Sequence, residues 1–111
     1  MAKFMVLFKS SASASELMAS SSPEEMKASM AEWMSWKDKL DSSIGFEWGM
    51  PLQAETEVTS SEIKASQSTV SGYAVMEGSK DAIAEILKTH PHLKRDGASI
   101  EVLEMMSMPG M

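Results

Sequence analysis

Both histidines of the chain lie close together, on either side of a proline, as His90, Pro91 and His92. An imidazole titrates near neutral pH, so a histidine in a pocket can take up or release a proton, and it can also bind a metal ion. The same segment has a structural interpretation, because Pro91 disfavours helical geometry at the residue before it. The histidines therefore mark either a site of chemistry or the boundary between a helix and a strand.

A metal site at this segment needs ligands besides the two imidazoles. The chain contains no cysteine, so only Asp96, Glu101 or a second copy of the chain remain as donors near His90 and His92. A copper site made of methionine thioethers is a further alternative, with ligands at the C-terminal Met105, Met106, Met108 and Met111. Flexible methionines also fill gaps in small cores, so we favour this packing role and expect no bound metal.

Length and charge limit the class of protein. A chain of 111 residues with 43% hydrophobic content can build one core, which predicts a single domain over residues 1–111. Ten basic and sixteen acidic residues give a net charge of -6, which repels nucleic acid and anionic membrane surfaces. No apolar run has the length of a signal peptide or a membrane span, so we expect a cytoplasmic protein.

Two helices have clear start signals. Ser22, Pro23 and Glu25 form the pattern of a capping box, and the helix that follows extends to about residue 40. Its predicted buried face contains Met26, Met30, Trp33, Met34, Lys37 and Leu40. Ser79 caps a second helix, which ends near residue 89 because of the following proline. Its predicted buried face contains Ile83, Ile86, Leu87 and His90.

Four runs of residues predict β-strands, and most of them are apolar on both alternating faces: 3–9, 44–48, 70–77 and 98–106. Residues 53–68 are polar and rich in threonine, and they predict an exposed hairpin. Residues 10–22 predict a loop with at most one helical turn, and they lack the glycine spacing of a phosphate-binding loop, so no cofactor is expected.

The order of elements predicts an α+β fold, a ferredoxin-like β-α-β-β-α-β sandwich with an inserted hairpin.

The two helices of such a plan cover only one face of the sheet. Because the strands are apolar on both faces, the second face would expose a larger apolar patch than monomeric proteins usually tolerate. Each buried Val, Leu, Ile, Phe or Met side chain contributes about 1.5–3 kcal/mol to stability. We therefore expect a homodimer in which two sheets pack face to face.

Three segments resemble the YCII-related proteins and their DGPF-type relatives, which are small dimeric α+β barrel proteins. The segments are KFMVLFKS at 3–10, GYAVMEGSKDAIAEILKTHPHL at 72–93 and GASIEVLEM at 97–105. The Asp-Gly-Pro-Phe signature of these relatives is absent from the chain. The resemblance implies a dimeric α+β barrel with a cleft near the end of the second helix.

The family's proposed acid–base pair is a histidine in the first helix and an aspartate after the second helix. Glu25 stands at the first of these positions and His90 at the second, so the resemblance implies an exchanged pair. A carboxylate beside His90 would raise the pKa of the imidazole and suit it to acid–base catalysis, and the helix C-terminus would act in the same direction. We expect Glu25 and His90 to line one pocket, with apolar walls at Trp33 and Tyr73 and further polar contacts at His92 or Glu101.

Two functions follow from these observations. The first is binding of an unidentified small molecule in a cleft between sheet and helices, with acid–base chemistry by His90 and Glu25. The alternative is a non-catalytic homodimeric interaction or regulatory module, as the association of DGPF-type relatives with transcriptional sigma factors implies. Glu25 and His90 also have structural interpretations, as a capping residue and a helix-end residue. A ligand-binding protein needs open space around His90, whereas an interaction module has that space filled by side chains.

Overall fold

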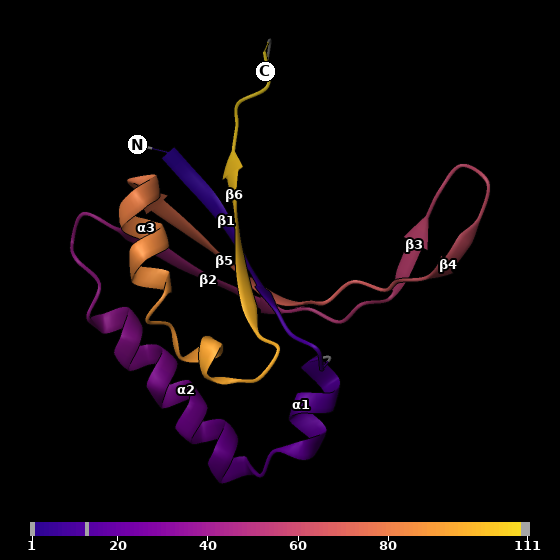
Figure 1. Cartoon of the computed structure of the whole chain (residues 1–111), viewed down its shortest axis with the longest axis horizontal. Coiled ribbons are helices and arrows are strands. Elements are labelled where there is room, and N and C mark those ends of the chain that lie inside the picture. Colours follow the sequence, from indigo (N-terminus) through magenta and orange to yellow (C-terminus); the bar gives the residue numbers. More distant parts are fainter. Residues whose placement is uncertain (1, 13, 110–111) are drawn as a thin grey trace.

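The computed structural model describes residues 2–12 and 14–109, within which a four-stranded sheet, a separate hairpin and several helices form (Figure 1). In chain order the elements are β1 (Ala2–Lys9), α1 (Ala14–Ser20), α2 (Pro23–Asp38), β2 (Gly45–Pro51), β3 (Thr56–Val58), β4 (Ile63–Ala65), β5 (Val70–Gly78), α3 (Lys80–Leu87), the 3₁₀ helix η1 (Pro91–Lys94) and β6 (Ser99–Met105). This order confirms the predicted α+β class. Met111, one of the methionines considered as copper ligands, lies outside the described residues.

The main sheet is antiparallel throughout and has the strand order β2-β5-β1-β6. The first strand of the chain is therefore a central strand, and its two neighbours come from the second half of the sequence. Val6 of β1, for example, lies opposite Ala74 of β5 and Val102 of β6. The other two strands, β3 and β4, pair only with each other and form the predicted hairpin.

The core lies between the helices and one face of the sheet. Phe4, Val6 and Phe8 of β1 are buried on this inner face, whereas Met5 and Leu7 between them point to the opposite, outer face and are half-buried. Ile83 and Leu87 of α3 and Trp36 of α2 complete the buried cluster on the helix side, together with Ala74 and Met76 of β5. The alternation of residue types along β1 thus predicted which side chains share a face.

Helix α2 begins as predicted, but its buried face differs from the prediction. Ser22 accepts a hydrogen bond from the backbone N–H of Glu25, and the Glu25 side chain accepts one from the N–H of Ser22. Trp36 is the buried residue of the helix, whereas three side chains of the predicted face are exposed: Met26, Met30 and Met34. The N-terminal half of α2 extends past the end of the sheet, so Met26 and Met30 have no sheet to pack on (Figure 1).

Residues 10–22 were predicted to form a loop with at most one helical turn, and the structure contains more helix than this. Residues Ala14–Ser20 form α1, a helix of 7 residues. Alanine, glutamate, leucine and methionine all favour helix, and they outweigh the serines of this segment. Across the described ranges, moreover, no helix has both the length and the apolar character needed to span a membrane.

Candidate functional site

His90 lies between α3 and η1, where the chain leaves one helix and enters the next. Its backbone is extended at this point, as the following proline requires, and its Nδ1 atom accepts a hydrogen bond from the backbone N–H of His92 at 3.0 Å. The side chain of His90 is therefore the N-cap of η1. The residue is 2% exposed, so the expected burial of His90 is confirmed.

His92 fastens η1 to the sheet. Its Nε2 atom lies 2.9 Å from the backbone carbonyl oxygen of Lys9, the last residue of β1. A carbonyl can only accept, so this ring nitrogen carries the proton and donates it. Like His90, His92 is buried. Both histidines thus have defined structural roles in the connection between α3 and β6.

Aromatic rings fill the space around His90. The centroid of its imidazole lies 5.0 Å from that of Phe8, 4.5 Å from Trp33 and 4.4 Å from Trp36. Both tryptophan rings meet the imidazole in T-shaped geometry. The Nε2 atom of His90 is buried without a hydrogen-bond partner among the described residues. The imidazole is thus enclosed by rings instead of facing open space.

Burial determines the protonation of His90. Desolvation lowers the pKa of His90 from 6.5 to about 4, and repulsion from His92 acts in the same direction. Desolvation also lowers the pKa of His92, although hydrogen bonds to the backbone of Lys9 and Ser99 oppose the shift. The expectation of a raised pKa at His90 is therefore wrong, because no carboxylate partner compensates for the loss of water. At neutral pH the imidazole of His90 is uncharged.

Glu25 lies elsewhere. It is an exposed residue in the first turn of α2, and its carboxylate accepts a hydrogen bond from the backbone N–H of Ser22 at 3.1 Å. Trp33, which contacts His90, follows eight residues later, and eight residues correspond to about 12 Å along a helix axis. The expected hydrogen bond between Glu25 and His90 is not formed in the described structure, because the capping box and the length of α2 separate the two side chains.

Two more residues of the implied pocket lie on the other side of the sheet. Tyr73 and Glu101 both pair with Leu7, one from each neighbouring strand, so all three side chains belong to the outer face. The Glu101 carboxylate lies 3.7 Å from the ammonium group of Lys9. Of the six residues predicted for the site, the structure brings together His90, His92 and Trp33.

Trp36 was not among the predicted site residues, although it contacts His90 and anchors the end of α3. Its indole N–H donates to the hydroxyl oxygen of Thr89 at 2.9 Å, and that hydroxyl donates to the carbonyl of Ile86 at 2.6 Å. Trp36 follows Trp33 by three residues and therefore shares its helix face. The spacing of the two tryptophans was the sequence signal for this contact.

Two depressions mark the surface. One of about 220 Å³ lies between the start of α1 and the base of the hairpin, and one of about 560 Å³ lies between α2 and the segment from α3 to η1. Neither of these two is lined by Glu25 or His90. Within residues 2–12 and 14–109, no three His, Cys, Asp or Glu side chains gather closely enough to hold a metal ion. The metal site considered for His90 and His92 with Asp96 or Glu101 is thus not assembled.

Comparison with known proteins gives no match, either to a protein-family model or to a curated protein. Membership of the YCII-related family therefore stays a prediction from the three resembling segments.

Proposed function

We propose that this protein is a non-catalytic homodimeric interaction module of the YCII-related kind, in which two sheets pack through their outer faces into an α+β barrel. The observation that carries the proposal is the composition of the outer face. Its apolar side chains come from three adjacent strands and are Met5, Leu7, Tyr73, Val75, Leu103 and Met105.

The register of the strands makes this face continuous. Met5 of β1 lies directly between Val75 of β5 and Leu103 of β6, so apolar side chains adjoin one another across the middle of the sheet. Leu103 is 46% exposed and Met105 is 47% exposed in the single chain. A contiguous apolar surface of this kind is typical of a protein–protein interface. Packing two copies together would remove it from water.

The surroundings of His90 support an interaction module over an acid–base enzyme. Phe8, Trp33 and Trp36 occupy the space that a substrate would need. The lowered pKa keeps His90 uncharged at neutral pH, so the imidazolium form that could act as a general acid is scarcely populated. The Glu25 carboxylate is engaged in its capping box. Both residues of the implied catalytic pair thus have a structural role that needs no reaction.

Sedimentation velocity at micromolar concentration tests the proposal. The wild-type chain should sediment as a dimer, and Met5→Glu, which places a charge in the middle of the outer face, should sediment as a monomer. Met34→Glu is the matched control, because it makes the same chemical change on the exposed side of α2 and should leave the dimer intact. A wild-type chain that stays monomeric at these concentrations would refute the proposal.

Small-molecule binding is a second candidate, and the depression between α2 and η1 favours it. Its volume of about 560 Å³ is within the range of ligand pockets, and it combines the apolar Trp36, Ile86 and Pro91 with the charged Glu32 and Lys94. Each of the three tryptophans contributes one indole N–H to the NMR spectrum, so once the Trp36 signal is assigned, a fragment library can be screened by its shift. A ligand should move this signal in the wild type, and Ile86→Glu should abolish the response.

A further inference from the structure

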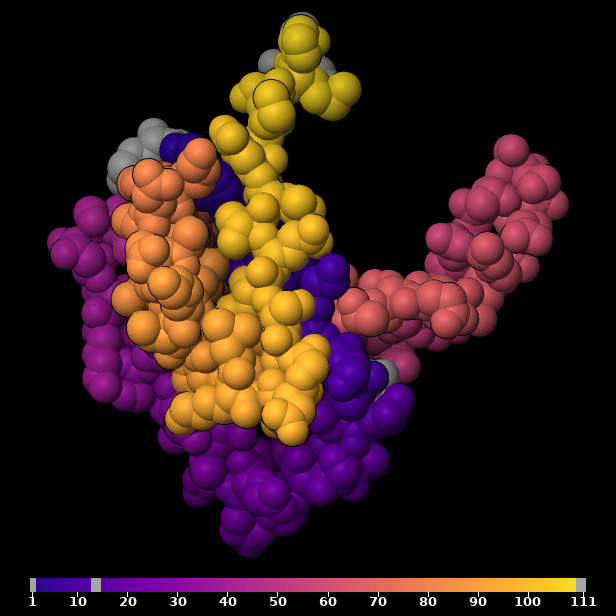
Figure 2. Space-filling view, viewed as in Figure 1, coloured from indigo at the N-terminus to yellow at the C-terminus, as the bar shows by residue number. Residues whose placement is uncertain are grey.

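The hairpin projects from the body of the protein as an arm, which we define as residues 55–66. It leaves the sheet where β2 ends and β5 begins, on the side away from α3 (Figures 1 and 2). Every residue from 55 to 65 is exposed. The arm contains the strands β3 and β4, which are 3 residues long each.

The bonds that hold the arm in shape lie within the arm itself. At its base the N–H of Ser66 donates to the carbonyl of Glu55 at 3.1 Å, and at its tip the N–H of Thr59 donates to the carbonyl of Glu62 at 2.9 Å. Lys64 forms ion pairs with Glu57 and Glu62, but pairs this exposed contribute little to stability. An isolated two-stranded hairpin is marginally stable in water, so the arm needs a surface to pack on.

One apolar pair on the arm is suited to such a surface. Val58 of β3 lies directly opposite Ile63 of β4, and the two residues are 68% and 74% exposed. Charged and polar residues surround the pair, as at many interfaces where an apolar centre has a polar rim. These two side chains are thus the part of the arm that gains most from leaving water.

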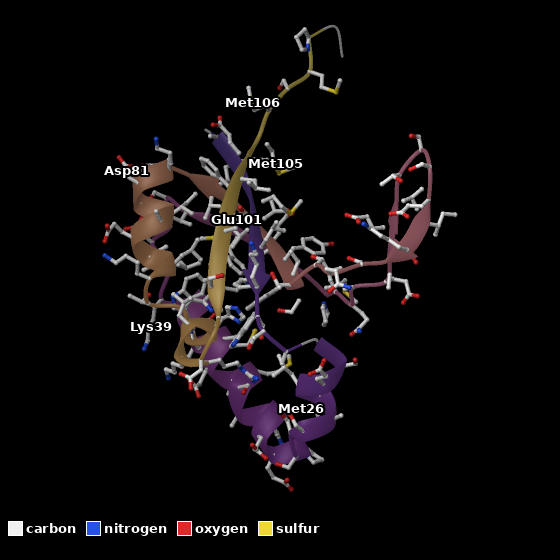
Figure 3. All side chains as sticks on the ribbon, turned by 45° about the vertical axis from the view of Figure 1, so that its right-hand side comes forward. Met26, Lys39, Asp81, Glu101, Met105 and Met106 are labelled. Atoms are coloured by element: carbon white, nitrogen blue, oxygen red, sulfur yellow. The ribbon has the colours of Figure 1, made fainter. Side chains whose placement is uncertain are left out.

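The arm and the sheet enclose a wide hollow. Figure 2 shows the hollow between the arm and β6, and Figure 3, which labels Glu101 and Met105 on β6, shows the same gap from another direction. The outer face is one wall of the hollow.

We propose that the arm of each protomer closes over β6 of the partner subunit, so that Val58 and Ile63 pack against Leu103 and Met105 of the partner subunit. This inference rests on the proposed dimer. A twofold axis that runs along the strands places β2 of one protomer across from β6 of the other, because these strands are the two edges of the sheet. The arm continues from β2, so it reaches the partner's β6 and also shields the free backbone groups at that edge.

Engineered cysteines test the contact directly, since the chain contains no cysteine of its own. The double variant Ile63→Cys with Leu103→Cys should form a covalent dimer on mild oxidation, because a disulfide requires Cα atoms within about 7 Å of each other. Each single variant should stay uncrosslinked, and an equimolar mixture of the two should give a dimer with one disulfide. A disulfide within one chain, or no disulfide at all, would overturn the inference.

The dissociation constant of the dimer tests the contribution of the apolar pair Val58 and Ile63. Val58→Ser with Ile63→Ser should weaken the dimer by roughly tenfold to a hundredfold, while circular dichroism shows that the fold is kept. Met30→Ser, at a residue on α2 that is 65% exposed, is the matched control and should leave the constant unchanged. If the wild type is monomeric, both the dimer and the arm contact are refuted. If it is a dimer that the arm variants do not weaken, only the arm contact is refuted.

Discussion

The backbone N–H of His92 donates a hydrogen bond to Nδ1 of His90 across 3.0 Å. A nitrogen that accepts a hydrogen bond carries no proton, so the neutral imidazole of His90 must hold its proton on Nε2. That N–H group faces a shell of aromatic rings, where a weak N–H···π contact is its available partner. The long-range ¹H–¹⁵N NMR spectrum at neutral pH should therefore show the Nε2–H tautomer for His90. A protonated Nδ1 would contradict the capping role.

Acid should destabilise the protein through the same residue. The folded-state pKa of His90 is about 4 and its ordinary value is 6.5, so the unfolded chain binds the proton more readily between these two values. The contribution of His90 is fully present above pH 6.5 and is lost as the pH falls toward 4. A shift of this size corresponds to about 3 kcal/mol in the free energy of unfolding. Urea denaturation at several pH values measures how much unfolding free energy is lost as the pH falls.

His90→Phe provides the control for this pH dependence. Phenylalanine suits the aromatic shell but cannot titrate, so the variant should lose less stability on acidification than the wild type. It also leaves the N–H of His92 without its acceptor, which costs about 1–3 kcal/mol at all pH values. This cost does not change the slope of the unfolding free energy against pH. Equal slopes for the two proteins would show that other groups cause the acid sensitivity.

Glu25 should prove to be a capping residue. Ser22→Ala removes the hydroxyl that accepts the N–H of Glu25 and should lower the free energy of unfolding by about 1 kcal/mol. Glu25→Gln keeps the reciprocal hydrogen bond, since glutamine also serves in a capping box, and should change stability little. Glu24→Gln, one residue earlier, controls for the loss of charge. A large loss of stability in Glu25→Gln would assign the carboxylate another role.

Two glycines of the neighbouring strands β2 and β5 should respond differently to a methyl group. A Cβ atom at Gly49 would lie 2.5 Å from ring carbons of Tyr73, so Gly49→Ala forces the ring or the strand to move. We expect a loss of about 1–3 kcal/mol, the usual cost of overpacking. Gly72→Ala is the matched control, because its Cβ would meet its nearest neighbour at 3.6 Å. Thermal denaturation of the two variants tests the difference, and equal melting temperatures would contradict it.

Much of the fold was predictable because its signals are local. The capping residues Ser22 and Ser79 mark the first residues of α2 and α3, and the alternation in β1 separates its two faces. The exposed methionines of α2 could not be predicted, because they depend on where the sheet ends in space. In α1 the serines concealed a helix, since their preference for turns is weaker than the helix preference of their neighbours.

The candidate site was harder to predict for a related reason. Periodicity shows that Tyr73 and Ala74 face opposite sides of the sheet, but it does not show which side the helices cover. Tyr73 and Glu101 were therefore assigned to the pocket around His90 and lie on the outer face instead. The enclosure of His90 depends on Phe8, Trp33 and Trp36, three rings from two distant segments of the chain.

The central place of β1 has a consequence for biosynthesis. Residues 2–9 are made well before 70–78 and 99–105, the two strands that flank them in the sheet. A nascent chain that lacks these later strands cannot pair β1, so the sheet can begin to form only after residue 78 has been made and is complete only after residue 105. Contacts this distant in sequence slow folding, and throughout the delay an apolar stretch stays accessible to chaperones.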